Sequence, residues 1–105
     1  MREHHFRIED AVEYGVEKAI LLYNIEYWLG KNKANGKNLK DGYYWTYNSS
    51  TAFFKLFPYL SVRSISRWLK QLEDDGIILS TYKYNKFGAD KTKWYTIPSK
   101  YREEQ

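Results

Sequence analysis

The 105-residue chain has no cysteine and no long apolar segment. Without cysteine it can form neither disulfides nor Cys-ligated metal sites, which fits a reducing compartment. The longest apolar run, Ala19–Tyr23, is far too short to span a bilayer. The N-terminus, Met1–His5, lacks the apolar run and the small-residue cleavage site of a signal peptide. We therefore expect a soluble, cytoplasmic protein.

Residue sets for catalysis and metal binding are also missing. The only two histidines, His4 and His5, are adjacent and close to the N-terminus, where a flexible tail is expected rather than a site. The paired carboxylates at positions 74–75 and 103–104 are typical of solvated helix ends and tails. No glycine-rich phosphate loop and no Ser/His/Asp set is found. The sequence therefore predicts a protein that is not an enzyme and uses no cofactor and no metal.

Aromatic and basic residues are abundant instead. Aromatics make up 19% of the chain and hydrophobic residues 43%, enough for one domain with a modest core. The net charge of +4 is unevenly spread, with three basic and six acidic side chains in residues 1–29, five and one in residues 30–60, and seven and four in residues 61–97. One end of the molecule is therefore expected to be positive, as in proteins that bind a polyanion.

The N-terminal third is expected to be helical. Ile8–Tyr14 suits a short helix that Gly15 stops, and helix-forming residues continue from Val16 to about Lys33. Apolar residues lie nearly all around Val16–Leu29, so more than one face of this helix must be covered. A central position in the domain and a contact between two copies both explain this pattern, and we expect a homodimer through Val16–Leu29.

The middle of the chain is expected to contain a loop, a strand and a helix. Gly30–Gly42 is polar, basic and rich in Gly and Asn, which indicates a loop. Tyr43–Tyr47 has the aromatic and β-branched composition of a short strand. Asn48 or Ser49 offers an N-cap for a helix through Leu56, and Pro58 ends this helix.

The C-terminal half has the order of a winged helix-turn-helix. Ser61 is expected to cap a helix over Val62–Asp75, which follows the short turn Pro58–Ser61 and ends before Gly76. Ile77–Tyr84 and Thr92–Ile97 are expected to pair as a hairpin with a basic tip.

A helix-turn-helix with an appended hairpin is a winged helix. The predicted fold class is therefore α+β, mainly α, with N-terminal helices and a C-terminal β-hairpin wing. We expect residues 1–98 to form this one domain and Ser99–Gln105 to be a flexible tail or the start of a linker.

The helix Val62–Asp75 has the amphipathic pattern of a recognition helix. At about 100° per residue from Val62, its apolar residues fall between roughly 240° and 340° and its basic residues between roughly 80° and 140°. The basic side would face outward, where arginine can bond a guanine edge or a phosphate. A solvated amphipathic helix is the alternative, and the neighbouring turn and hairpin favour contact with double-stranded DNA. The candidate DNA-binding residues here are Ser61, Arg63, Ser64, Ser66, Arg67 and Lys70.

The hairpin contributes a second group of candidates. Its lysines could lie along a neighbouring backbone or in the minor groove, although lysines on hairpins also protect strand edges. Half of its aromatics are expected to pack on the recognition helix, and the others either stack on bases or are ordinary sheet aromatics. The candidate DNA-binding lysines are Lys83, Lys86, Lys91 and Lys93, and Lys37, Lys40 and Lys55 are further candidates for phosphate contacts.

Several segments together resemble a known family. They are Trp45–Ser49 (WTYNS), Leu56–Ser61 (LFPYLS), Ser64–Leu69 (SISRWL) with Leu72, Glu73 and Gly76, and Asp90–Tyr95 (DKTKWY). This set resembles the N-terminal winged-helix domain of phage replication-initiation proteins, which include replisome-organiser and DnaD-like proteins. The last segment matches their Asp-Arg-Thr-x-Trp-Tyr pattern with Lys in place of Arg, and the resemblance covers roughly residues 16–97.

The resemblance implies DNA binding at a replication origin in the cytoplasm of a bacterial host, and self-association through the N-terminal elements. Such proteins usually carry a further C-terminal domain that recruits helicase or its loader, so helicase loading is not carried over to these 105 residues.

Two alternative functions share this fold. A transcriptional repressor would use the same groove contacts on a palindromic target at a promoter. A winged-helix protein-interaction module would have no affinity for DNA at physiological salt. We expect sequence-dependent binding of double-stranded DNA in phage or prophage replication initiation, with these two as the alternatives.

Overall fold

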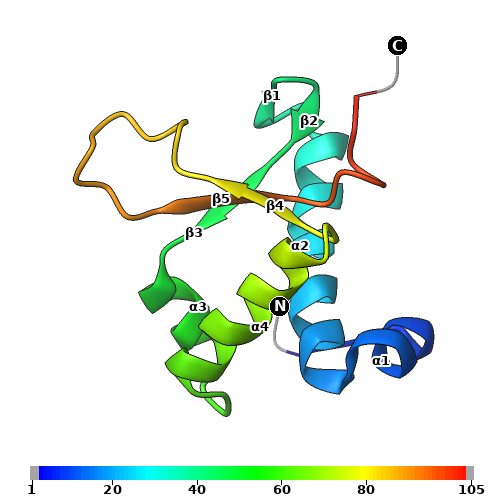
Figure 1. The fold of residues 1–105 in the computed structure, drawn as a ribbon. Helices are drawn as coiled ribbons and strands as arrows, with labels where there is room; N and C mark the ends of the chain where they lie inside the picture. Colours follow the sequence, from blue (N-terminus) through cyan, green and yellow to red (C-terminus); the bar gives the residue numbers. More distant parts are fainter. Residues whose placement is uncertain (1–2, 104–105) are drawn as a thin grey trace.

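Figure 1 shows the computed structural model of the chain, which describes residues 3–103. The fold is α+β and rich in helix, as the sequence predicts at this level. No helix within the described residues is long and apolar enough to cross a membrane. The elements are α1 (Ile8–Tyr14), α2 (Val16–Ala34), β1 (Leu39–Lys40), β2 (Tyr43–Tyr44), β3 (Thr46–Asn48), α3 (Ser50–Leu56), α4 (Val62–Asp74), β4 (Leu79–Thr81) and β5 (Lys93–Thr96).

The strands form two small antiparallel sheets. β1 pairs with β2, and the other three strands form a sheet in the order β3-β5-β4, in which Tyr47 lies opposite Trp94. In Figure 1, α3 and α4 lie below this sheet and the β1–β2 hairpin lies above it. We call the side of the three-stranded sheet toward α3 and α4 the inner face and the opposite side the outer face. The Tyr95 ring is on the inner face, where it meets Phe53 of α3 edge-on at 5.5 Å.

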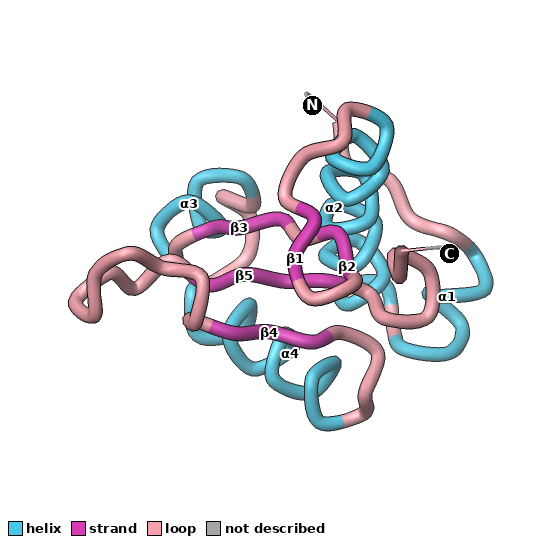
Figure 2. The backbone as a smooth tube through the Cα atoms, turned by 90° about the horizontal axis from the view of Figure 1, so that it is seen from above, coloured by secondary structure: helices cyan, strands magenta, loops and turns pink. Residues whose placement is uncertain are grey.

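Helix α2 is central, and Figure 2 shows it running beside the sheet. Leu21, Leu22, Ile25 and Leu29 are at most 5% exposed and belong to one core with residues of α3, α4 and β5. A central position therefore accounts for the apolar pattern around this helix. The homodimer through Val16–Leu29 stays a prediction, and the packing of these leucines does not require it.

Helices α3 and α4 begin at the predicted caps. Ser49 Oγ accepts a hydrogen bond from the Ala52 amide at 3.1 Å, and Ser61 Oγ accepts one from the Ser64 amide at 3.1 Å. Each such cap is worth about 1 kcal/mol. α4 ends one residue earlier than expected, and Gly76 has the left-handed φ of 73° that favours glycine after a helix.

The segment 30–42 differs from the expected loop. α2 continues to Ala34, and β1 and β2 then form a tight hairpin. The turn of this hairpin is Asp41-Gly42, whose φ values of 53° and 82° are both positive, as in the Asp-Gly turns of tight hairpins; the loop prediction overlooked this signal because it relied on the polar composition of the segment. The strand expected over 43–47 is likewise split at Trp45, whose indole is buried and donates to the Lys40 carbonyl at 2.9 Å.

The two strands of the C-terminal hairpin are shorter than expected. The strand expected over 77–84 is confined to Leu79–Thr81, because Thr81 Oγ1 accepts from the Lys83 amide and turns the chain out of the sheet. The strand expected over 92–97 is confined to Lys93–Thr96. The connection between them, residues 82–92, is consequently longer than the predicted tip.

Both ends of the described chain pack on the domain. The expected tail begins at Ser99, yet the Tyr101 hydroxyl donates to the Glu26 carbonyl at 3.1 Å and the Glu103 amide donates to the Gly42 carbonyl. The tail prediction is therefore wrong for residues 99–103, and positions 104–105 lie outside the described residues. At the other end, the His4 ring stacks on Phe57 with 4.4 Å between the ring centroids, so it does not belong to a free tail.

Candidate nucleic-acid interface

Helix α4 divides into a buried side and an exposed side. Ile65, Leu69 and Leu72 are at most 7% exposed and attach the helix to the core. The opposite side consists of exposed polar and basic residues, which we call the α4 surface: Arg63, Ser66, Arg67 and Lys70. The helical wheel therefore predicted the orientation of this helix correctly.

The α4 surface is positive and largely uncompensated. No acidic group within residues 3–103 lies at ion-pair distance from Arg63 or Arg67. Lys70 Nζ lies 3.2 Å from Asp74 Oδ1, one turn later on the helix. Both of these side chains are more than 60% exposed, so this pair is weak and leaves Lys70 able to bind another anion.

The first turn of α4 offers backbone donors beside these cations. The cap uses the Ser64 amide and the Ser61 oxygen, and Ser64 itself is half-buried. The amides of Val62 and Arg63 have no acceptor inside the helix, as at any helix start. Together with the helix dipole they favour an anion at this end.

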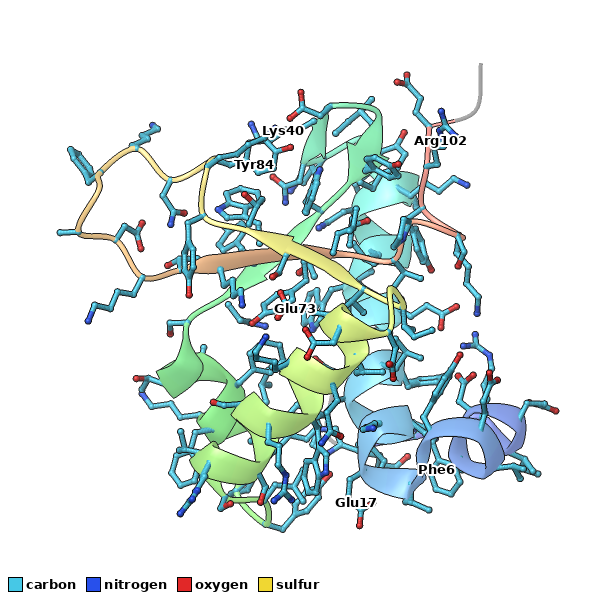
Figure 3. All side chains as sticks on the ribbon, in the orientation of Figure 1. Phe6, Glu17, Lys40, Glu73, Tyr84 and Arg102 are labelled. Atoms are coloured by element: carbon cyan, nitrogen blue, oxygen red, sulfur yellow. The ribbon has the colours of Figure 1, made fainter. Side chains whose placement is uncertain are left out.

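A cleft of about 260 Å³ separates α4 from the hairpin. Ser66, Lys70 and Glu73 line one wall and Tyr82 and Lys93 the other. Lys93 Nζ and Glu73 Oε1 are 3.2 Å apart across it, and both side chains are less than 30% exposed. Figure 3 shows Glu73 on the side of α4 that faces the sheet. The sequence did not indicate this partner, which holds Lys93 against α4 instead of leaving it free for DNA.

The remaining candidate lysines of the hairpin lie in two places. Lys86 and Lys91 are exposed in the loop at its tip, without an ion-pair partner among the described residues. Lys83 turns toward the β1–β2 hairpin, where its Nζ lies 2.8 Å from Asp41 Oδ2. The structure therefore separates Lys83 from the α4 surface.

The same carboxylate connects Lys83 with a tyrosine. Asp41 also accepts a hydrogen bond from the Tyr84 hydroxyl. The hydrogen bond from Lys83, followed by that from Tyr84, lowers the pKa of Asp41. Burial of the hydroxyl, together with its bond to Asp41, raises the pKa of Tyr84 to about 12.

Side-chain hydrogen bonds hold the loop at the tip of the hairpin. Asn85 Nδ2 donates to the Thr92 carbonyl, and Asn85 Oδ1 accepts from Trp94 Nε1 at 2.8 Å. Asp90 Oδ1 accepts from the Thr92 amide at 2.9 Å, and this bond lowers the pKa of Asp90. The positions of Lys86 and Lys91 are therefore defined by Asn85 and Asp90.

The further lysine candidates also fall on different sides. Lys55 is exposed on α3, below the sheet, whereas Lys37 and Lys40 are exposed at and beside the β1–β2 hairpin. Among the hairpin aromatics, Tyr95 is on the inner face and Trp94 on the outer face, and Tyr84 lies against Trp94 with 5.5 Å between the ring centroids.

Comparisons with known proteins add nothing to this geometry, since no family model, no curated protein and no solved structure matches the chain. Within residues 3–103, no three His, Asp or Glu side chains gather as a metal site would require.

Proposed function

We propose that this chain is a winged helix-turn-helix domain that binds double-stranded DNA in a sequence-dependent manner. The α4 surface enters the major groove, and Lys86 and Lys91 at the tip of the hairpin contact the neighbouring backbone or minor groove. The observation that supports this most strongly is the pair of exposed arginines on α4, Arg63 and Arg67, for which the described chain offers no acidic partner. Exposed arginines on one side of a helix are suited to bidentate contacts with guanine and to phosphate contacts.

The order and pairing of the elements support the winged-helix assignment. Helix α2 is followed by the small β1–β2 hairpin and then by β3, the two helices α3 and α4, and the hairpin β4–β5. β3 closes the sheet on the far side of β5. Residues 57–61 join α3 to α4 in a tight turn, in which the Leu60 amide donates to the Phe57 carbonyl at 2.9 Å. A short turn between two helices followed by a hairpin is the arrangement of winged DNA-binding domains.

Two of the lysines that the sequence predicts to bind DNA are left out of the proposed interface. Lys83 and Lys93 lie in ion pairs with Asp41 and Glu73 and are less suited to phosphate contacts. The proposed interface then consists of the first turn of α4, the α4 surface, and the two lysines at the tip.

The biological role that we propose is replication initiation in a phage or prophage, and it rests on the resemblance of the sequence segments quoted above. A repressor would use the same α4 surface, so the nature of the target decides between the two. Selection of bound sequences from a random duplex pool should yield repeated sites of a replication origin. Recovery of a single palindrome from a promoter would favour a repressor.

The direct test is fluorescence anisotropy of labelled duplex DNA, titrated with the wild type and with Arg63→Glu/Arg67→Glu. We expect the wild type to bind in a salt-sensitive manner and the variant, still folded by circular dichroism, to lose binding. The matched control is Lys33→Glu/Arg102→Glu, which makes the same change in net charge at exposed positions outside the proposed interface. No binding by the wild type even at low salt would refute the proposal and favour a protein partner for the α4 surface.

A further inference from the structure

The outer face of the three-stranded sheet has an aromatic surface that the proposed duplex interface does not use. Tyr47 of β3 and Trp94 of β5 lie opposite each other with 4.6 Å between their ring centroids, and Tyr84 follows at 5.5 Å from Trp94. We call these three residues the outer aromatic face. The α4 surface lies on the other side of the sheet, below it in Figure 1.

Two of these rings are held in place, and the third is open to solvent. Trp94 Nε1 donates to Asn85 Oδ1 at 2.8 Å, and the Tyr84 hydroxyl donates to Asp41. Tyr47 is 51% exposed, so its ring is accessible to a ligand. A rigid pair of rings beside an open one is a preformed surface on which a flat ligand can stack with little loss of conformational freedom.

Lysines lie beside the outer aromatic face at its Tyr84–Trp94 end. Lys40 Nζ lies 5.5 Å from the Tyr84 ring centroid and 5.8 Å from that of Trp94, and Lys83 Nζ lies 5.3 Å from Tyr84. Figure 3 shows Lys40 and Tyr84 together above the sheet. Asp41 neutralises Lys83, which leaves Lys40 to attract a polyanion. Lys37 adds a further positive charge in a groove beside Tyr47.

A polar groove of about 360 Å³ runs beside Tyr47, between the free edge of β3 and the C-terminal part of α2. Lys37, Asn38 and Asn48 are among its lining residues. Asparagine amides can donate to and accept from the edges of nucleobases, and lysine can bind a phosphate. The groove therefore adds hydrogen-bonding groups and charge next to the exposed ring.

We propose that the outer aromatic face and this groove form a second binding site, for single-stranded nucleic acid. Unpaired bases stack on aromatic rings while lysines follow the backbone, and this combination is typical of single-strand binding. A duplex does not fit the same site, because its bases are already stacked on each other. The inference does not depend on duplex binding by α4, since the two surfaces share no residue.

The test measures binding of labelled oligodeoxythymidylate and oligouridylate, two unstructured probes that distinguish DNA from RNA, by anisotropy and tryptophan quenching at low salt. Tyr47→Ala should weaken binding roughly tenfold or more. Tyr47→Phe should bind like the wild type, because it keeps the ring. Tyr59→Ala is the matched control, since Tyr59 is 58% exposed but lies outside the outer aromatic face.

Variants of the α4 surface distinguish a failure of this inference from a failure of the proposed duplex binding. Arg63→Gln/Arg67→Gln should reduce duplex binding but affect the single-strand probes no more than the charge-matched Lys33→Gln/Arg102→Gln. Tyr47→Ala should leave duplex binding unchanged. The inference is overturned if neither probe binds the wild type at low salt, if Tyr47→Ala binds as tightly as the wild type, or if Tyr59→Ala weakens binding equally.

Discussion

The salt dependence of duplex binding tests the interface quantitatively. Each neutralised phosphate contributes about −0.9 to the slope of log Kobs against log salt concentration for B-DNA. The sequence predicts seven basic DNA-binding residues on α4 and the hairpin: Arg63, Arg67, Lys70, Lys83, Lys86, Lys91 and Lys93. Within residues 3–103, Asp41 and Glu73 hold Lys83 and Lys93, whereas the weak pair with Asp74 leaves Lys70 able to bind a phosphate. The other five predict a slope of about −4.5, whereas all seven would give about −6.3.

The corresponding experiment is a series of duplex titrations at different salt concentrations. With the predicted slope, affinity falls roughly 500-fold between about 50 mM and 200 mM salt. Arg63→Gln/Arg67→Gln removes two of the five contacts and should reduce the slope to about −2.7. Lys33→Gln/Arg102→Gln lowers the net charge equally and should keep the wild-type slope. A wild-type slope near −6, or an unchanged slope in the arginine variant, would refute this assignment of contacts.

Three further predictions concern the fold. Leu72→Ala should lower the free energy of unfolding by about 2–5 kcal/mol in urea denaturation, because Leu72 is only 1% exposed; a loss below about 1 kcal/mol would contradict its place in the core. Tyr101→Ala should cost about 2 kcal/mol in the same assay, since the ring packs on the core and its hydroxyl bonds to Glu26, whereas a neutral effect would restore the tail interpretation. The raised pKa of Tyr84, about 12 against 10.0, means that its neutral hydroxyl stabilises the fold below about pH 10 and that this contribution is lost as the pH rises toward 12. Tyr84→Phe should therefore lose less stability than the wild type between about pH 10 and pH 12, and equal losses in the two proteins would show that Tyr84 ionises normally.

The parts of the fold that the sequence predicted are those with local signals. Ser61 and Gly76 mark the two ends of α4 because capping and the left-handed backbone depend on neighbouring residues only. The exposed side of α4 was predicted equally well, since helical periodicity alone separates Arg63 and Arg67 from the buried Ile65.

Other features were missed because they depend on contacts between distant residues. Glu73 reaches Lys93, twenty positions away, only after the hairpin has folded against α4. Lys83 joins Asp41 because the connection that follows β4 lies against the turn of the β1–β2 hairpin, which no local pattern indicates. Tyr101 was assigned to a tail for the same reason, because its partner Glu26 is on α2.

The structure also shows what the family-like segments do in this chain. Phe57 is fully buried and Ser61 caps α4, while Asp90 shapes the tip of the hairpin and Tyr95 packs on Phe53. These residues maintain the architecture and do not belong to the proposed α4 surface. Ser66 and Arg67 in the segment Ser64–Leu69 are the exceptions, because they are exposed and belong to the α4 surface.

The separation of roles on α4 has an evolutionary consequence. Ile65, Leu69 and Leu72 hold the helix, so Arg63, Ser66 and Arg67 can be replaced with little effect on folding. Under the proposed function, single substitutions on the α4 surface would change the preferred DNA target without compensating mutations in the core. The same property makes the helix a scaffold for libraries, in which these exposed positions are randomised while the buried ones stay fixed.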